Sequence, residues 1–186
     1  GRARPAGHVR RARSSLVRHS NPEVTMLPAS LLLAAALAAD PVPPAACTAP
    51  QHRAFDFWVG TWDVTVGAKV AGQNRIERIL SGCGLQEHWT GARGNRGTSL
   101  NWFDPADGKW HQLWLDDEGT VLRLEGGIKD GAMVLEGEAP GPGGKLERQR
   151  ITWSKLAGGK VRQHWEASAD GKAWRTVFDG LYAPRG

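Results

Sequence analysis

Three side chains in this sequence have the chemistry to move protons on a small molecule. His164 and Glu166 lie two residues apart, and a histidine beside a carboxylate can serve as a general acid–base pair. Glu87 lies two residues before Trp89, so in a strand the carboxylate and the indole share one face. Glu87, His164 and Glu166 are therefore the candidate catalytic residues of an isomerase or hydrolase.

The surroundings of His164 and Glu166 favour a different interpretation. The two residues alternate with Trp165, and charged residues at every second position are typical of the solvated outer face of a strand. The sequence has no Gly-x-Ser-x-Gly nucleophile motif and no phosphate-binding loop. A protein that binds a ligand without turnover is the leading hypothesis, and an enzyme is the alternative.

No metal site or cofactor is expected. Two cysteines without a Cys-x-x-Cys spacing disfavour zinc, and the acidic run at 116–118 indicates an exposed turn and not a calcium loop. Haem could use a strand histidine such as His88, His111 or His164, as in barrels related to nitrobindin. The glycine-rich signature of those barrels is not found in this sequence.

Nine tryptophans supply the apolar side of the expected binding site. Trp110 and Trp114 share a strand face with Gln112 between them, and Gln163 accompanies Trp165 in the same way. Inward tryptophans with a few polar groups suit a planar or hydrophobic ligand held by one or two hydrogen bonds. The residues expected to bind it are Trp62, Glu87, Trp89, Trp102, Gln112, Trp114, Trp153, Gln163 and Trp165. The alternative is a solid core that the tryptophans simply fill.

Strands must position these residues, because no long segment from Phe55 onward has apolar residues at helical spacing. Short alternating runs are separated by Gly, Asp and Asn turns such as DPADGKW, IKDGAM, LAGGKV and SADGKAW. They predict about ten strands, over 61–66, 73–81, 85–90, 97–103, 109–115, 120–126, 131–138, 146–154, 160–167 and 173–182. Phe55 to Val59 is expected to be a helical turn or short lid. A sandwich is the alternative architecture, but consecutive short hairpins favour an antiparallel up-and-down β-barrel, in which closure removes exposed sheet edges.

The stretch FWVGTWDV, residues 57–64, places Gly60-Thr61-Trp62 at the start of the first strand. This triplet resembles the Gly-x-Trp of the calycins, which include lipocalins and fatty-acid-binding proteins. The stretches FDFWVGTWDV, IERILSGCGLQEHWTG, GTSLNWFDPADGKWHQLWLD and RQHWEASADGKAWRTVFDGLY are similar to an uncharacterised family of exported bacterial proteins with a lipocalin-like barrel. The resemblance implies a calycin-like barrel with a ligand-sized interior, in which Trp62 closes one end beside an arginine such as Arg175 or Arg185. It carries no established catalytic residues.

The N-terminal part indicates export to the periplasm or the exterior. Met26 to Ala39 is apolar, too short to span a bilayer as a helix, and contains Ala36-Leu37-Ala38, an A-x-A cleavage site typical of a signal peptide. The expected organisation is an arm and signal peptide over 1–39, a Pro/Ala-rich lead over 40–54, and one barrel domain over 55–186. No integral membrane span is expected.

The distribution of charge along the chain bears on a nucleic-acid partner. The chain has 24 Lys and Arg against 19 Asp and Glu, but the excess lies in residues 1–38, and the remainder has equal numbers. A nucleic-acid partner is therefore disfavoured, since it would need a basic face on the fold.

In an oxidising compartment Cys47 and Cys83 are expected to form one disulfide; two free or buried thiols are the alternative.

Overall fold

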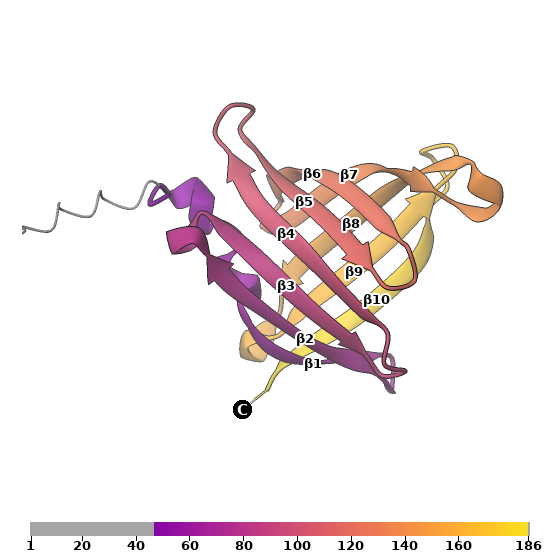
Figure 1. Ribbon diagram of the computed structural model, residues 1–186, viewed down its shortest axis with the longest axis horizontal. Helices are drawn as coiled ribbons and strands as arrows, with labels where there is room; N and C mark the ends of the chain where they lie inside the picture. The colour runs from indigo at the N-terminus through magenta and orange to yellow at the C-terminus, as the bar shows by residue number, and fades with distance from the viewer. Residues whose placement is uncertain (1–46, 186) are drawn as a thin grey trace, which may run out of the picture. The chain divides into compact units, whose positions relative to one another are not determined.

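The computed structural model describes residues 47–185, which form a closed barrel of ten antiparallel strands (Figure 1). The strands are β1 (Gly60–Val66), β2 (Lys69–Ile79), β3 (Gly84–Gly91), β4 (Arg96–Asp104), β5 (Lys109–Asp116), β6 (Val121–Lys129), β7 (Ala132–Pro140), β8 (Leu146–Lys155), β9 (Val161–Ser168) and β10 (Arg175–Pro184). Each strand pairs with its neighbours in sequence, and β1 pairs with β10. The expected all-β up-and-down barrel is confirmed, and closure satisfies the backbone groups that a sheet edge would expose.

The predicted strands match the observed ones in number and order, and most ends agree within two residues; β6 continues to Lys129, three residues beyond its predicted end, and the largest difference is near the first hairpin. A break was expected over 67–72, whereas β2 already begins at Lys69. The turn is short because Gly67 has φ +56°, and Gly72 belongs to the strand. A Cβ atom at Gly72 would lie 2.3 Å from the carbonyl oxygen of Thr90, so glycine here serves close strand packing and not a turn.

Two short 3₁₀ turns, η1 (Pro50–Arg53) and η2 (Asp56–Trp58), precede the barrel and close one end of it. Phe55 and Trp58 are fully buried and stack with ring centroids 4.9 Å apart. Phe55 also makes edge contacts with Trp110 and Trp153, so the end of the barrel is filled by aromatic rings. The expected helical turn at 55–59 is confirmed, and it acts as the plug of what we call the capped end. The remaining 3₁₀ turns lie in loops, at η3 (Leu80–Gly82), η4 (Pro142–Gly144) and η5 (Ala157–Gly159).

The Gly-x-Trp triplet has a direct structural role at the capped end. The indole N–H of Trp62 donates to the carbonyl oxygen of Trp58 at 3.0 Å, which ties β1 to η2. A Cβ atom at Gly60 would lie 3.2 Å from the same indole, and Gly60 has φ +153°, a conformation that favours glycine. Glycine therefore lets the ring fold back over the start of its own strand. The two arginines considered as partners pair elsewhere, Arg185 with Asp63 and Arg175 with Glu147.

The expected disulfide is present and joins the lead to the capped end. Cys47 is bonded to Cys83, which follows η3 between β2 and β3. Nearby, Arg53 of η1 donates to the carbonyl oxygen of Gly82 at 3.4 Å. The signal segment over 1–39 and the first part of the lead lie outside the described residues, so their expected roles stay predictions.

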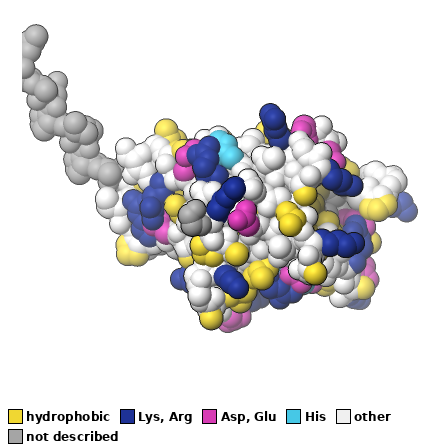
Figure 2. All heavy atoms as spheres, turned by 90° about the horizontal axis from the view of Figure 1, so that it is seen from below, with side chains coloured by type: hydrophobic (Ala, Val, Ile, Leu, Met, Phe, Trp, Pro, Cys, Tyr) yellow, Lys and Arg dark blue, Asp and Glu magenta, His cyan; other side chains and the backbone are white. Residues whose placement is uncertain are grey.

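The outer surface of the barrel carries charges of both signs. Figure 2 shows one face, on which Lys and Arg side chains are interspersed with Asp and Glu and with small apolar patches. Several of these charges are paired, as in Arg162 with Asp179 and Arg150 with Glu166. Within residues 47–185, no helix has the length and apolar character needed to cross a membrane.

Candidate ligand-binding site

A cavity of about 630 Å³ occupies the barrel interior and opens at the end opposite the cap. Its rim comes from hairpin residues such as Arg93, Asn95 and Glu118, and Val177 of β10 adds to it. Its wall and floor are Trp89, Trp114, Trp165, Phe178, Tyr182, Leu122, Ile151, Glu87, Gln112 and Gln163. Its volume lies in the range of known small-molecule pockets, roughly 300–1,000 Å³. The interior is therefore not a solid core at this end.

Glycines in the neighbouring strands leave room for two of the wall tryptophans to lie against the sheet. A Cβ atom at Gly97 would lie 2.3 Å from ring atoms of Trp114, and one at Gly72 would lie 2.9 Å from the ring of Trp89. Each indole thus lies where another residue's side chain would stand. The rings line the wall and leave the centre of the barrel open.

Hydrogen bonds fix two of the wall tryptophans, and a ring contact holds the third. The Trp165 indole N–H donates to Oε1 of Gln149 at 2.8 Å, and the Trp114 indole N–H donates to Oδ2 of Asp116 at 3.1 Å. Trp89 makes an edge contact with Phe178, with ring centroids 6.3 Å apart. Because their polar atoms are occupied or their rings are packed, the aromatic wall is ordered before any ligand arrives.

Glu87 lies at the floor of the cavity and is 4% exposed. Its Oε1 accepts a hydrogen bond from Asn74 Nδ2 at 2.6 Å, and its Oε2 accepts one from the Ser99 hydroxyl at 2.6 Å. A carboxylate has about four acceptor positions, so these two bonds leave capacity for a ligand. β2 and β4 flank β3 and supply one donor each.

Further donors converge on Glu87 through a chain of polar side chains. Gln112 Nε2 donates to Asn101 Oδ1 at 2.7 Å, and Asn101 Nδ2 donates to the Ser99 hydroxyl at 2.9 Å. The Ser99 hydroxyl then donates to Glu87, so every hydrogen in this chain points toward the carboxylate. Such a chain is polarised cooperatively in favour of negative charge at its end.

Burial acts on Glu87 in the opposite direction. Desolvation raises the pKa of this carboxyl to about 7, against the lowering effect of its hydrogen bonds from Ser99 and Asn74. The pKa of Tyr182 is raised as well, first by burial and then by the nearby charge of Glu87. Tyr182 donates to Gln163 Oε1 and accepts from Asn74 Nδ2 at 3.3 Å, which extends the polar floor to β9 and β10. The floor therefore holds an acid that can exchange a proton near neutral pH.

The structure brings six of the nine expected binding residues into this one cavity: Glu87, Trp89, Gln112, Trp114, Gln163 and Trp165. Trp62 and Trp153 also point inward, but they are buried at the capped end, where Trp153 packs on Phe55 and Trp58. They do not line the cavity.

The expected inward orientation of Trp102 is wrong. The residue is 38% exposed on the outer face and stacks on His111, with ring centroids 5.3 Å apart. Ser99 and Asn101 are the buried residues of β4, and the alternation of a strand then places Trp102 outside. The inward face of β4 is therefore the one that joins the polar network at the cavity floor, whereas hydrophobicity alone predicts the opposite face.

His164 and Glu166 lie on the outer face of β9, as the alternation with Trp165 indicated. His164 Nδ1 is 3.7 Å from Glu166 Oε2, and its Nε2 is hydrogen-bonded to Thr176 at 3.0 Å. Glu166 accepts from Arg150 at 3.1 Å and neither residue lines the cavity. Of the three candidate catalytic residues, Glu87 alone faces the enclosed space.

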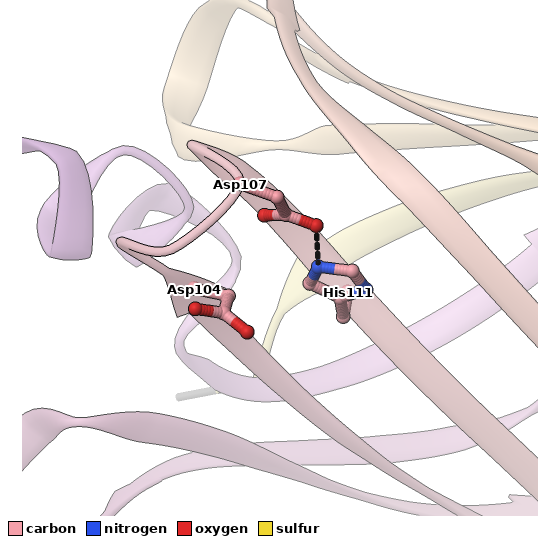
Figure 3. Close-up of side chains that lie close together, drawn as sticks. All are labelled: Asp104, Asp107 and His111. Carbon is pink, nitrogen blue, oxygen red and sulfur yellow. Dashed lines mark hydrogen bonds and ion pairs between the residues drawn. The ribbon is translucent and has the colours of Figure 1, made fainter.

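A second group of polar side chains lies in the β4–β5 hairpin at the capped end. Asp104, Asp107 and His111 have ligand atoms within 4.8 Å of one another, and Figure 3 shows the hydrogen bond between Asp107 and His111. Both carboxylates also accept backbone N–H groups, of Ala106 and Lys109 respectively. These bonds close the turn, which accounts for the acidic residues without a bound ion.

The sequence did not identify two residues that line the cavity, Phe178 and Tyr182. It also did not identify the three buried polar residues that hydrogen-bond around its floor, Asn74, Ser99 and Asn101. Asn74, Ser99 and Asn101 are polar, so hydrophobicity does not predict that they point inward. Their inward position follows only from the register of β2 and β4 with the strands that carry Glu87 and Gln112. Tyr182 ends the last predicted strand, over 173–182, and in the structure it pairs with the buried Val161 of β9.

Comparison with known proteins finds no matching family model and no matching curated protein sequence.

Proposed function

We propose that this protein is an exported calycin-like barrel that binds a small hydrophobic or aromatic molecule. The observation that carries the proposal is the cavity of about 630 Å³ with Trp89, Trp114 and Trp165 on its wall and Glu87 on its floor. Pockets with apolar walls and a few placed polar groups are typical of small-molecule binding.

The architecture supports binding in a second way. The capped end is filled by Phe55 and Trp58 and held by the Cys47–Cys83 disulfide, whereas the opposite end is open. A ligand would enter at the hairpins and stop at the polar floor. Gly60-Thr61-Trp62 at the plug supports a relationship to the calycins.

Export is proposed from two features. Met26–Ala39 has the pattern of a signal peptide, and the disulfide suits an oxidising compartment. Purification of the protein from a bacterial periplasm, with its N-terminus sequenced, would test this; a chain retained uncleaved in the cytoplasm contradicts it.

The test of binding is a titration of the protein with lipids, tetrapyrroles and aromatic metabolites, followed by tryptophan fluorescence. Saturable quenching is expected for at least one class. Trp114→Phe should remove a large share of the quenching, whereas Trp102→Phe, on the outer face of the adjacent strand, should leave the ligand-induced change intact. Quenching that is equally insensitive to both substitutions, or absent for every class, contradicts the proposal.

An enzyme that uses Glu87 is the second candidate, and the pKa of about 7 favours it. A carboxyl with this pKa in an enclosed site can accept or donate a proton at neutral pH, as an isomerase or hydrolase requires. Incubation with a metabolite extract, analysed by mass spectrometry, would show substrate loss that Glu87→Gln abolishes and His164→Ala retains. No turnover, or turnover unaffected by Glu87→Gln, removes this candidate.

A further inference from the structure

The cavity is lined by more acidic than basic side chains, and the binding of a neutral hydrophobic molecule does not require this excess of acidic groups. Glu87 is enclosed at its floor, and Asp116 and Glu118 lie at its rim. Among the lining residues one is basic, Arg93, which is exposed in the hairpin between β3 and β4. The cavity is therefore acidic from floor to mouth.

The groups around Glu87 prepare it to carry a negative charge but do not neutralise that charge. Its two bonded partners, Asn74 and Ser99, are neutral, and the chain of donors from Gln112 through Asn101 ends on its Oε2. Buried carboxylates are ordinarily paired with a cation. The two groups bonded to Glu87 are neutral dipoles, so a cationic ligand in the cavity would supply the opposite charge.

The aromatic wall favours the same kind of occupant. Trp89, Trp114 and Trp165 present ring systems to the enclosed space, and Phe178 packs beside Trp89. A cation near an indole face is attracted by the negative face of the ring, and the attraction is stronger where water is excluded. Aromatic rings together with one carboxylate form the type of site that recognises ammonium groups.

We propose that the cavity selects an organic cation, in which an ammonium group is carried on an aromatic or other apolar body. The ammonium group would lie against Glu87 and the apolar body between the wall tryptophans. This inference rests on the proposed binding function and adds the charge and the orientation of the ligand.

The experiment compares three probes of nearly equal shape: naphthylmethylamine, which is a cation near pH 8, naphthylmethanol, which is neutral, and naphthoate, which is an anion. Calorimetric titration of the full chain is expected to give an affinity for the amine at least about tenfold higher than for the alcohol, with naphthoate weakest. In Glu87→Gln the advantage of the amine over the alcohol should fall to about twofold or less.

The outcomes separate the two proposals. If the wild-type protein binds the alcohol or naphthoate as tightly as the amine, the cation preference is overturned and the binding function stands. If the amine is preferred equally in Glu87→Gln, the assignment to Glu87 is overturned. If none of the probes binds to the wild-type protein, the binding of aromatic molecules in this cavity fails as well. The comparison in the wild-type protein decides the cation preference even where the variant folds poorly, and the pH dependence of the affinity in the wild-type protein then tests the role of Glu87.

Discussion

The indole of Trp114 lies directly against the backbone of Gly97 in the adjacent strand. A Cβ atom at Gly97 would be 2.3 Å from two atoms of the indole ring. The ring is also tied to Asp116 by its N–H, so it has little freedom to move along the wall. The width of the cavity at this level therefore depends on the absence of one side chain.

Replacement of Gly97 by alanine should reduce both the affinity for ligand and the stability of the fold. The added methyl group must push the Trp114 ring into the cavity, and such overpacking costs about 1–3 kcal/mol of unfolding free energy. We expect at least several-fold weaker binding of an aromatic probe, measured by calorimetry. Gly127 is a suitable control, because a Cβ atom there meets nothing within 4 Å and the residue lies in β6. Unchanged affinity in Gly97→Ala, or an equal loss in Gly127→Ala, contradicts the argument.

The disulfide should stabilise the capped end without contributing to binding. Cys47 and Cys83 are 36 residues apart, and cross-linking a loop of this size contributes roughly 3–4 kcal/mol in the chain-entropy model. Cys47→Ser combined with Cys83→Ser should lower the urea midpoint accordingly. The affinity for an aromatic probe at low temperature should stay within about twofold, because the cavity opens at the other end. A large loss of affinity in a variant that is still folded would show that the cap shapes the cavity.

The fold was predictable because its signals are local. Turn glycines such as Gly108, Gly131 and Gly171 all have positive φ, which their Asp-Gly context indicated. Alternation then fixes the faces of most strands, which is why Glu87, Gln112 and Gln163 were correctly expected to share the interior with their tryptophans.

The site was less predictable because its polar floor reverses the usual rule. In β4 the buried residues are Ser99 and Asn101, and the large apolar Trp102 is outside. Only the pairing of β4 with β3 and β5 shows that these polar groups meet Glu87 and Gln112. Likewise, the separation of Trp62 and Trp153 from the cavity depends on the plug formed by η2, which hydrophobicity cannot locate along the barrel axis.

Glu87 should make the stability of the free protein depend on pH. Its pKa is about 7 in the folded state and 4.5 as the ordinary value, so the folded protein binds the extra proton between these values. This contribution to stability is complete below about pH 4.5 and is lost as pH rises through about 7. Two to three pKa units correspond to roughly 3 kcal/mol. Glu87→Gln removes this contribution, so in urea unfolding the stability of the variant relative to the wild-type protein should increase from about pH 5 to about pH 8. A constant difference between the two proteins over this range would contradict the buried acid.

The affinity for a cation should rise with pH through the same interval. A fixed positive charge favours the ionised form of Glu87, so below about pH 7 binding must displace a proton, and affinity falls by up to about tenfold for each pH unit. The neighbours that face this carboxyl, Asn74, Ser99 and Tyr182, do not change charge here, since the pKa of Tyr182 is raised well above 10.0.

Benzyltrimethylammonium is the appropriate probe, because its own charge does not titrate. Its affinity should increase between about pH 6 and pH 8 in the wild-type protein and stay nearly constant in Glu87→Gln. The charged groups at the rim, Arg93, Asp116 and Glu118, are present in both proteins. A pH dependence that persists in Glu87→Gln would therefore assign the effect to the rim and not to the floor of the cavity, and equal affinity at all pH values in the wild-type protein would remove Glu87 from cation recognition.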